Sequence, residues 1–325
     1  PADPAARAAR RVSAGGAGLR YDARALCTGA GRRRLPGAIG GELPGVHVVR
    51  TLADVDAMAP AIRPGARALV VGGGYIGLEA AAVCRTAGME VTLVEAAPRI
   101  LGRVAAPETA DRIRALHAAR GVTIREGTGL ERLTGDDHVT GAVLSDGTEL
   151  AADLVIVGIG ITPATALAEA AGLEIENGIR ADALGRTSDP AIWTAGDCAS
   201  FPWHGARIRL ESVQNAIDQA EAVARNMLGA EAPYDPTPWF WSDQYDMKLQ
   251  IAGLNTGYDR VVVRPGATAA SASHWYYAGD RLLAVDALNA PRDYMVGKRL
   301  IEAGRSPAPA ALADPATDLK ALLAG

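Results

Sequence analysis

The sequence has 325 residues, of which 49% are apolar and 22% charged, and a formal net charge of −4 at pH 7. This balance argues against a nucleic-acid or membrane-surface partner, and no apolar run reaches the roughly 18 residues of a transmembrane helix. The cysteines Cys27, Cys84 and Cys198 are far apart and the five histidines show no ligand spacing. We therefore expect neither a disulfide framework nor a metal site, and we expect a cytoplasmic protein of two or three domains.

A glycine-rich turn follows the apolar run 68–71 and opens an Ala-rich stretch that ends near Gly88. In a strand–turn–helix unit of this kind, Gly72 permits the tight turn and Gly74 lets a pyrophosphate approach the backbone. Gly77 lets the helix pack closely on the strand. The helix N-terminus offers unpaired N–H groups and a positive dipole end to the phosphates.

The next apolar run, 91–94, ends in Glu95, which lies 23 residues beyond Gly72. An acidic residue at this place accepts hydrogen bonds from a ribose 2′-OH, which favours NAD over NADP. The pattern therefore predicts a dinucleotide site in a parallel α/β sheet. The alternative is a glycine-rich turn in an ordinary parallel sheet.

Two stretches of the chain, 12–22 and 143–153, both read as a hairpin arm, a glycine turn, a return arm and an aspartate before an apolar strand. The two strands end alike, at Gly29 and at Gly160, and the offset is 131 residues throughout. An ungapped correspondence of this kind indicates two copies of one nucleotide-binding unit. Chance similarity is the alternative.

The repeat makes a prediction about the first copy. The counterpart of Gly72 would lie before residue 1, and the chain begins with Pro1 in what reads as the middle of a hairpin. We therefore expect the first glycine-rich loop, its helix and its acidic residue to be absent, so that this chain is a fragment whose first unit is incomplete.

The other elements follow from hydrophobic periodicity and from turn signals. We expect helices at 107–120, 163–171 and 212–228, strands at 122–124, 249–254 and 281–285, a hairpin turn at 146–147, and a short strand that ends at 194–197. Tryptophan and tyrosine are concentrated after Pro233, which indicates a separate α+β domain over 237–325.

Several segments together resemble one family: 26–29, 72–95, 98–101, 158–163, 194–199, 211–220, 239–246 and 291–299. The most selective are Glu-Ser-Val-Gln-Asn-Ala, Trp-Ser-Asp-Gln-Tyr-Asp and Val-Gly-Lys-Arg. The chain resembles the FAD-dependent, NADH-using ferredoxin reductases that serve bacterial oxygenases, of the putidaredoxin reductase and rhodocoxin reductase type. They belong to the pyridine nucleotide-disulfide oxidoreductase superfamily.

The resemblance implies an α/β fold with two dinucleotide-binding, glutathione-reductase-like Rossmann domains, the first incomplete, and a C-terminal α+β domain. It implies that residues 1–64 and 159–236 bind FAD, 65–158 bind NADH and 237–325 form the reductase C-terminal domain. It further implies that electrons pass from NADH through FAD to a 2Fe-2S ferredoxin, or a rubredoxin-like protein, which serves an oxygenase such as a cytochrome P450.

The resemblance also implies roles for residues at the flavin. Asp197, after Gly196, corresponds to the aspartate that binds the ribityl chain, and a loop or cap aspartate is the alternative. Thr28 and Gly29 correspond to a turn against the FAD adenosine, with a purely structural turn as the alternative.

A long helix begins with Val213 and Gln214, whose N–H groups can stabilise negative charge on the flavin ring; the alternative is an ordinary helix start. Trp241, with Trp239, is expected to flank the flavin or the electron-exit surface. The alternative is that one tryptophan is buried and the other covers a domain seam.

Near the nicotinamide, the resemblance implies that Glu79 faces the flavin and that Tyr75 gates the contact between the two rings. An exposed helix glutamate and a core tyrosine are the alternatives. Ile76 belongs to the same cofactor-binding turn, and Gly160 would give the nicotinamide room, unless it is only a turn glycine. If Glu79 is buried without a basic partner, its pKa should be raised.

Three basic residues, Arg292, Lys298 and Arg299, are candidates for docking an acidic ferredoxin, and the favoured alternative is a solvated charged face. Three other functions remain open: a rubredoxin reductase, a disulfide or peroxide reductase, and a non-catalytic fragment that binds NADH but cannot hold FAD. The C-terminal domain lacks the His-Pro-x-x-x-Glu pattern that disulfide reductases use as an acid–base pair.

Overall fold

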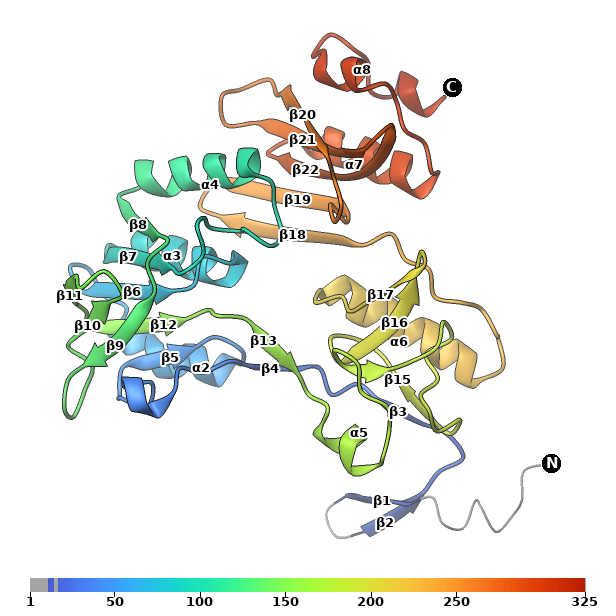
Figure 1. Cartoon of the computed structure of the whole chain (residues 1–325), viewed down its shortest axis with the longest axis horizontal. Helices are drawn as coiled ribbons and strands as arrows, with labels where there is room; N and C mark the ends of the chain where they lie inside the picture. The colour runs from blue at the N-terminus through green and yellow to red at the C-terminus, as the bar shows by residue number, and fades with distance from the viewer. Residues whose placement is uncertain (1–10, 15–16, 325) are drawn as a thin grey trace. The chain divides into compact units, whose positions relative to one another are not determined.

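The computed structural model describes residues 11–14 and 17–324, and its chain divides into two compact units (Figure 1). Unit 1 comprises Pro1–Gly31 and Thr162–Pro238, and unit 2 comprises Arg32–Ile161 and Trp239–Gly325. The chain therefore crosses between the units more than once. The expectation that it begins in the middle of a hairpin concerns residues 1–10, which lie outside the described residues.

Unit 2 contains a five-stranded parallel sheet in the order β5-β12-β6-β7-β8. Its strands are β5 (Val46–Val48), β6 (Arg67–Val71), β7 (Glu90–Glu95), β8 (Val122–Glu126) and β12 (Leu154–Val157). Successive residues of β6 and β12 pack into two separate clusters, one on each face of the sheet. A sheet that is buried on both faces requires continuous apolar strands, as these two are.

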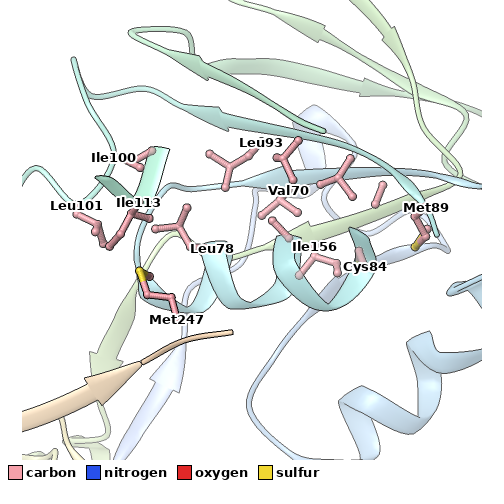
Figure 2. Packing of buried hydrophobic residues seen from close by; sticks show 14 of the residues in the cluster. Val70, Leu78, Cys84, Met89, Leu93, Ile100, Leu101, Ile113, Ile156 and Met247 are labelled. Carbon is pink, nitrogen blue, oxygen red and sulfur yellow. The ribbon is translucent and has the colours of Figure 1, made fainter. Parts of the chain in front are cut away.

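Two helices cover one face of this sheet: α3 (Tyr75–Thr86) and α4 (Pro107–Ala119). Figure 2 shows Leu78 and Cys84 of α3 beside Val70 and Leu93 of the strands, all of them at most 1% exposed. Met247 also belongs to this cluster, so the first core of unit 2 includes a strand from the C-terminal part of the chain.

The other face carries a three-stranded antiparallel sheet, whose strands are β9 (Leu130–Thr134), β10 (Gly141–Leu144) and β11 (Glu149–Ala151). The hairpin turn expected at 146–147 is confirmed, because β10 and β11 pair across it. Helix α2 (Leu52–Met58) begins at a capping box in which Thr51 and Asp54 bind each other's backbone. The short 3-10 helices η1 (Gly37–Ile39) and η2 (Ala59–Ala61) complete this part.

The boundary at residue 64/65 that the sequence indicated differs from the structural division. Strand β5 pairs in parallel with β12, in the register Val46↔Val155, so it belongs to the sheet of unit 2. Residues from Arg32 onward are therefore in unit 2. Strand β5 has only three residues and lies between a Pro- and Gly-rich stretch and a helix. A strand this short does not reveal its pairing in the sequence.

The C-terminal part of unit 2 is a five-stranded antiparallel sheet in the order β18-β19-β22-β21-β20. Its strands are β18 (Trp239–Gln244), β19 (Met247–Gly253), β20 (Arg260–Pro265), β21 (Ala272–Ala278) and β22 (Arg281–Leu288), and it is accompanied by α7 (Pro291–Glu302), α8 (Pro309–Ala313) and η3 (Ala321–Leu323). Trp275, Tyr277 and Leu300 are fully buried in its core. Strands were expected at 249–254 and 281–285, and both are confirmed: β19 begins two residues earlier and ends at Gly253, and β22 continues to Leu288.

Unit 1 contains the hairpin β1 (Arg11–Ala14) and β2 (Ala17–Arg20), which confirms the first expected hairpin; its glycine turn at 15–16 lies outside the described residues. The other elements are β3 (Arg24–Leu26), β14 (Ile179–Arg180), β15 (Ile192–Thr194), β16 (Ala199–Trp203), β17 (Ala206–Ile208), α5 (Ala166–Ala170) and α6 (Val213–Met227). Strands β3 and β15 are parallel partners, and β14, β16 and β17 form a second sheet.

The helices expected at 107–120 and 212–228 are confirmed as α4 and α6, but the one expected at 163–171 begins too early. Residues Ile161–Pro163 form strand β13, and α5 covers only Ala166–Ala170. Strand β13 pairs with β4 (Ala30–Arg32), and the two are separated in sequence by the same 131 residues. The helical period over 163–171 does not reveal that Pro163 still belongs to a strand and that the helix begins only at Ala166.

The 131-residue offset also relates two backbone hydrogen bonds. The N–H of Ala164 donates to the carbonyl of Gly29 at 2.9 Å, and the N–H of Arg33 donates to the carbonyl of Gly160 at 3.0 Å. Adding 131 to Gly29 and Arg33 gives Gly160 and Ala164, so each bond is the counterpart of the other with the two copies exchanged. Both glycines have a positive φ, of 66° and 97°. This correspondence supports the interpretation that the chain contains two copies of one unit.

Candidate functional site

The predicted dinucleotide turn lies at the carboxyl edge of the parallel sheet of unit 2. The register pairs Val71 with Val94 and with Val157, so the segments that follow β6, β7 and β12 leave the sheet side by side. Gly72, Glu95 and the Gly158–Gly160 segment therefore share one edge. In open α/β sheets, this edge is where ligands bind.

The three glycines of the turn have different surroundings. A Cβ on Gly72, whose φ is +109°, would lie 2.4 Å from the carbonyl oxygen of Gly158, and a Cβ on Gly77 would lie 2.0 Å from that of Gly72. A Cβ on Gly74 would have no heavy atom within 4 Å. Gly72 and Gly77 are thus required by the fold itself, whereas the open space at Gly74 is available to a ligand.

Glu95 binds the backbone of the turn that it follows. One carboxylate oxygen accepts a hydrogen bond from the N–H of Gly73 at 2.6 Å, and the other accepts from the N–H of Ala97 at 2.7 Å. The side chain is half-buried. The carboxylate of Glu95 therefore lies against the glycine turn, at the sheet edge where we expect the ribose of the dinucleotide to bind.

Helix α3 presents an uncapped N-terminus at this edge. Its N-cap is Gly74, and within the described part of the chain no side chain caps it. Ile76 in the first turn is 45% exposed, although it is a large apolar residue. A Cβ on Gly160 would meet nothing within 4 Å. The edge thus combines free helix N–H groups, an uncovered apolar side chain and open backbone.

Tyr75 packs its ring against Phe240 of β18, with 4.8 Å between the ring centroids. Its hydroxyl is buried and has no hydrogen-bond partner among the described residues. Burial raises the pKa of Tyr75 well above its usual value, and the charge of Asp286 adds to this effect. The ring is therefore neutral at every ordinary pH and is held by the C-terminal sheet.

Glu79 lies at the start of the second turn of α3, on the side of the helix that contacts β18. Its carboxylate accepts a hydrogen bond from Ser242 Oγ at 2.5 Å. Burial raises the pKa of Glu79, the Ser242 hydrogen bond lowers it and Asp243 raises it further. The expectation of a raised pKa is confirmed in direction, and the neighbouring hydroxyl is a partner that the sequence did not reveal.

Trp241 also belongs to β18 and is 37% exposed. Its ring centroid lies 5.6 Å from that of Trp239, which packs against the C-terminal core beneath the ammonium of Lys298. Of the other basic candidates for docking, Arg292 pairs with Asp318. Lys298 pairs with Glu302, so neither cation is without a counter-charge.

A second group of predicted residues lies in unit 1. Strands β3 and β15 are parallel, with Leu26 opposite Thr194, so Thr28 and Gly196 each follow by two residues at the same edge. Thr28 Oγ1 donates to the carbonyl of Ala164 at 2.6 Å. The structure therefore brings together the Thr28-Gly29 turn and the Gly196-Asp197 turn, which are far apart in sequence.

Helix α6 begins next to this edge. The N–H of Gly196 donates to Gln219 Oε1 at 2.8 Å, which fixes the turn to the helix. Ser212 caps the helix through the N–H of Asn215, and Gln214 binds Asp218 one turn later. Val213 and Ile217, in the first two turns, are 61% and 49% exposed. These residues fit a flat, largely apolar ring system next to a helix N-terminus.

The sequence did not identify three buried polar residues close to Glu79: Ser242, Gln244 and His117. They are at most 1% exposed and hydrogen-bonded in a row. The segment Trp-Ser-Asp-Gln-Tyr-Asp was the available signal, but its polar residues gave no indication of a partner on α4.

Comparisons with known proteins show similarity along almost the whole chain. The model of the pyridine nucleotide-disulphide oxidoreductase family matches residues 3–220. The chain belongs to this family. A second model, reductase C-terminal, matches residues 239–323.

Among curated relatives of this reductase, a ferredoxin–NAD(P)(+) reductase of Sphingomonas sp. is 46% identical over 89% of the chain and 71% of the relative. Putidaredoxin reductase of Pseudomonas putida is 42% identical over 95% of the chain and 75% of the relative. A crystal structure of a covalent putidaredoxin reductase–putidaredoxin complex matches with a TM-score of 0.93 and 40% identity, covering 98% of this chain and 78% of that chain.

The fold class and the enzyme class predicted from the sequence are confirmed by this membership: the chain is an oxidoreductase of the two-dinucleotide type. FAD and a pyridine nucleotide are the cofactors of its family. None of the helices that the structure describes is long and apolar enough to cross a membrane. Within the same residues, no cluster of His, Cys, Asp and Glu side chains is suited to a metal ion.

Proposed function

We propose that this reductase passes electrons from NADH through FAD to a small 2Fe-2S ferredoxin that serves an oxygenase, in the cytoplasm. The observation that carries the proposal is the sheet edge of unit 2, where an open glycine, an uncapped helix and Glu95 occur together in a chain of this family. The relatives named for ferredoxin and putidaredoxin supply the class of acceptor.

The residues of unit 2 bind and orient NADH in this proposal. The N–H groups at the start of α3 hold the pyrophosphate, Gly74 lets it approach, and Glu95 accepts from the adenosine ribose. Gly160 leaves room for the nicotinamide, Ile76 contacts the bound nucleotide, and Tyr75 borders the nicotinamide with a ring that stays neutral. Glu79 places a carboxylate near the reacting rings.

The residues of unit 1 hold FAD in this proposal. Thr28 and Gly29 lie against its adenosine, Gly196 and Asp197 bind the ribityl chain, and the start of α6 with Val213 and Gln214 accepts the flavin ring. Trp241, in unit 2, flanks the flavin or the electron exit. FAD supplies the chemistry that links a two-electron donor to one-electron acceptors.

We also propose a functional division that keeps the predicted segments. Residues 1–64 and 159–236 would serve FAD, 65–158 NADH, and 237–325 the C-terminal reductase part, although residues 32–64 contribute a strand and a helix to unit 2. Separate variants at Glu95 and Asp197 test this division, because the first should affect NADH and the second only the flavin.

The test of the function is NADH oxidation by the purified protein with its flavin, using a bacterial 2Fe-2S ferredoxin as the acceptor. We expect bleaching of the ferredoxin absorbance that depends on NADH and is at least 10-fold slower with NADPH. Reduction of a small disulfide without ferredoxin reduction would support the disulfide reductase instead. Binding of NADH without any turnover would support the non-catalytic alternative, and either result would overturn the proposal.

Replacing Glu95 by Ala should weaken NADH binding by about 10-fold, because a charge-assisted acceptor is worth about 1.5 kcal/mol or more. It should also relax the preference for NADH over NADPH, since the carboxylate no longer repels a 2′-phosphate. Fluorescence titration of each nucleotide gives the two dissociation constants. Glu90→Ala, at the exposed start of the same strand, is the matched control. An unchanged ratio of the two constants would contradict the assignment.

A further inference from the structure

A row of buried polar side chains leads from Glu79 through the C-terminal sheet to α4. Its contacts are Ser242 Oγ to Glu79 Oε1 at 2.5 Å, Gln244 Nε2 to Ser242 Oγ at 3.1 Å, His117 Nε2 to Gln244 Oε1 at 2.8 Å, and Tyr245 OH to His117 Nδ1 at 3.3 Å. Ser242, Gln244 and His117 are at most 1% exposed. All of these residues lie in unit 2.

The direction of each hydrogen bond follows from the direction of its neighbour. An ionised Glu79 can only accept, so Ser242 must use its single proton on Glu79 and accept from Gln244. The oxygen of Gln244 then faces His117 Nε2, which must carry the proton. His117 Nδ1 is left as an acceptor for the hydroxyl of Tyr245. Every donor in the row therefore points toward the carboxylate.

Protonation of Glu79 on Oε1, the oxygen that faces Ser242, reverses the row. The new carboxyl proton is donated to Ser242, whose own proton then turns to the oxygen of a rotated Gln244 amide. The Gln244 nitrogen now faces His117 Nε2, which becomes the acceptor, and the imidazole proton moves to Nδ1, opposite the Tyr245 oxygen. One proton is taken from water by Glu79, and the tautomer change of His117 moves no net proton.

We propose that Ser242, Gln244 and His117 are positioning residues that hold the Glu79 carboxylate and link its charge to the tautomer of His117. This proposal rests on the proposed function for the relevance of Glu79 to the reaction. A buried polar row is costly unless every member is satisfied, so the alternation of donors makes the two complete arrangements the low-energy ones.

Charged groups lie near both ends of the row. Asp243 lies near Glu79 and opposes its ionisation. At the other end, Arg120 lies over the Tyr245 ring, 5.1 Å from its centroid, and Arg85 and Cys84 also act on Tyr245. Burial lowers the pKa of His117, and the Gln244 hydrogen bond opposes that effect, so His117 is neutral at pH 8. A neutral imidazole is what the tautomer switch requires.

The test measures the tautomer directly, by ¹⁵N NMR of the full chain labelled at histidine, at pH 8. The wild-type protein should show His117 protonated at Nε2. In Glu79→Gln the amide supplies a donor to Ser242, and the signal should move to the Nδ1-protonated form. Gln244→Met breaks the row, so the His117 tautomer should be the same in the single variant Gln244→Met and in the double variant Glu79→Gln with Gln244→Met. Gln250→Met, on β19 and outside the row, is the control for the loss of an amide.

The same tautomer in wild type and Glu79→Gln would overturn the proposal, as would a switch that persists in the double variant. A second measurement uses the pH profile of NADH oxidation. Ser242→Ala removes the hydrogen bond to the carboxylate, so the pKa of Glu79 should rise by about one pH unit and the acidic limb should move with it. An unmoved limb in an active variant would contradict the link. The NMR result needs no ferredoxin or NADH turnover, so it separates this inference from the proposed function.

Discussion

Gly74→Ala is expected to weaken NADH binding by about 100-fold while leaving the protein as stable as before. Gly77→Ala is expected to lower both the NADH affinity and the stability. The N-cap Gly74 has ordinary extended angles, φ −80° and ψ 178°, and its Cβ would enter open space. A methyl group there costs the fold nothing, but it occupies the position through which the pyrophosphate must approach. A steric overlap that costs about 3 kcal/mol of binding free energy corresponds to the 100-fold loss of affinity.

Gly77 differs because its Cβ would lie 2.0 Å from the carbonyl oxygen of Gly72 and 3.4 Å from Val70. Both atoms belong to the sheet and turn on which α3 packs, so the helix must shift as a body. Overpacking of this kind costs about 1–3 kcal/mol and should lower Tm by about 2–10 °C for a unit of this size. The shift also moves the helix N-terminus away from the phosphates.

The two variants are compared by thermal unfolding and by NADH titration of the same samples. Gly129→Ala is the matched control, since its Cβ would make only ordinary contact, 3.6 Å from Ala96. Equal loss of stability in both variants would mean that Gly74 is needed only for folding. Normal NADH binding in Gly74→Ala would place the pyrophosphate elsewhere.

Much of this architecture follows from local patterns in the chain. The parallel strands around Gly72 are buried on both faces and therefore read as uninterrupted apolar runs, and α6 has a clear serine cap. Both hairpins of the repeat could be read directly from the sequence, because the spacing of turn glycines and aspartates is fixed by strand length. These features are set by neighbouring residues, which a single sequence displays.

Other features depend on distant residues and could not be found in this way. Strand β5 has three residues, and only its pairing with β12 identifies it. His117 was assigned no role, because its partner Gln244 comes from a strand 127 residues later. Polar residues at core positions look like errors in a periodic pattern until the opposite strand is known, so the Trp-Ser-Asp-Gln-Tyr-Asp segment alone could not reveal the row that ends at Glu79.

Asp286 provides the largest expected effect on stability. This residue of β22 is 1% exposed and accepts hydrogen bonds from Thr109 Oγ1 at 2.7 Å and from the Tyr276 hydroxyl. Burial raises its pKa to about 6, from an ordinary value of 3.8, although both hydrogen bonds work in the opposite direction. The native protein therefore binds this proton more tightly than the unfolded chain does, and ionisation of Asp286 lowers the stability by about 3 kcal/mol between acid and neutral pH.

The sign of the pH dependence follows from that raised pKa. Between pH 4 and 6 the native state binds more protons than the unfolded chain, so the contribution of Asp286 is fully present below pH 4 and is lost as the pH rises through 6. His274, whose pKa is lowered by burial to about 4, acts in the opposite direction over the same range. The wild-type curve alone therefore does not isolate Asp286.

Asp286→Asn isolates it, because an amide oxygen can still accept from Thr109 and Tyr276 but cannot ionise. Relative to this variant, the wild-type free energy of unfolding should fall by about 1.4 kcal/mol from pH 5 to pH 8, and the variant should be the more stable protein at pH 8. Urea unfolding at both pH values measures the difference, with the exposed Asp280→Asn as the control. A difference that does not change with pH would mean that Asp286 is already ionised in the native protein at pH 5. The buried hydroxyls would then hold a stable anion behind Tyr75, and the charge that raises the pKa of Tyr75 would be permanent.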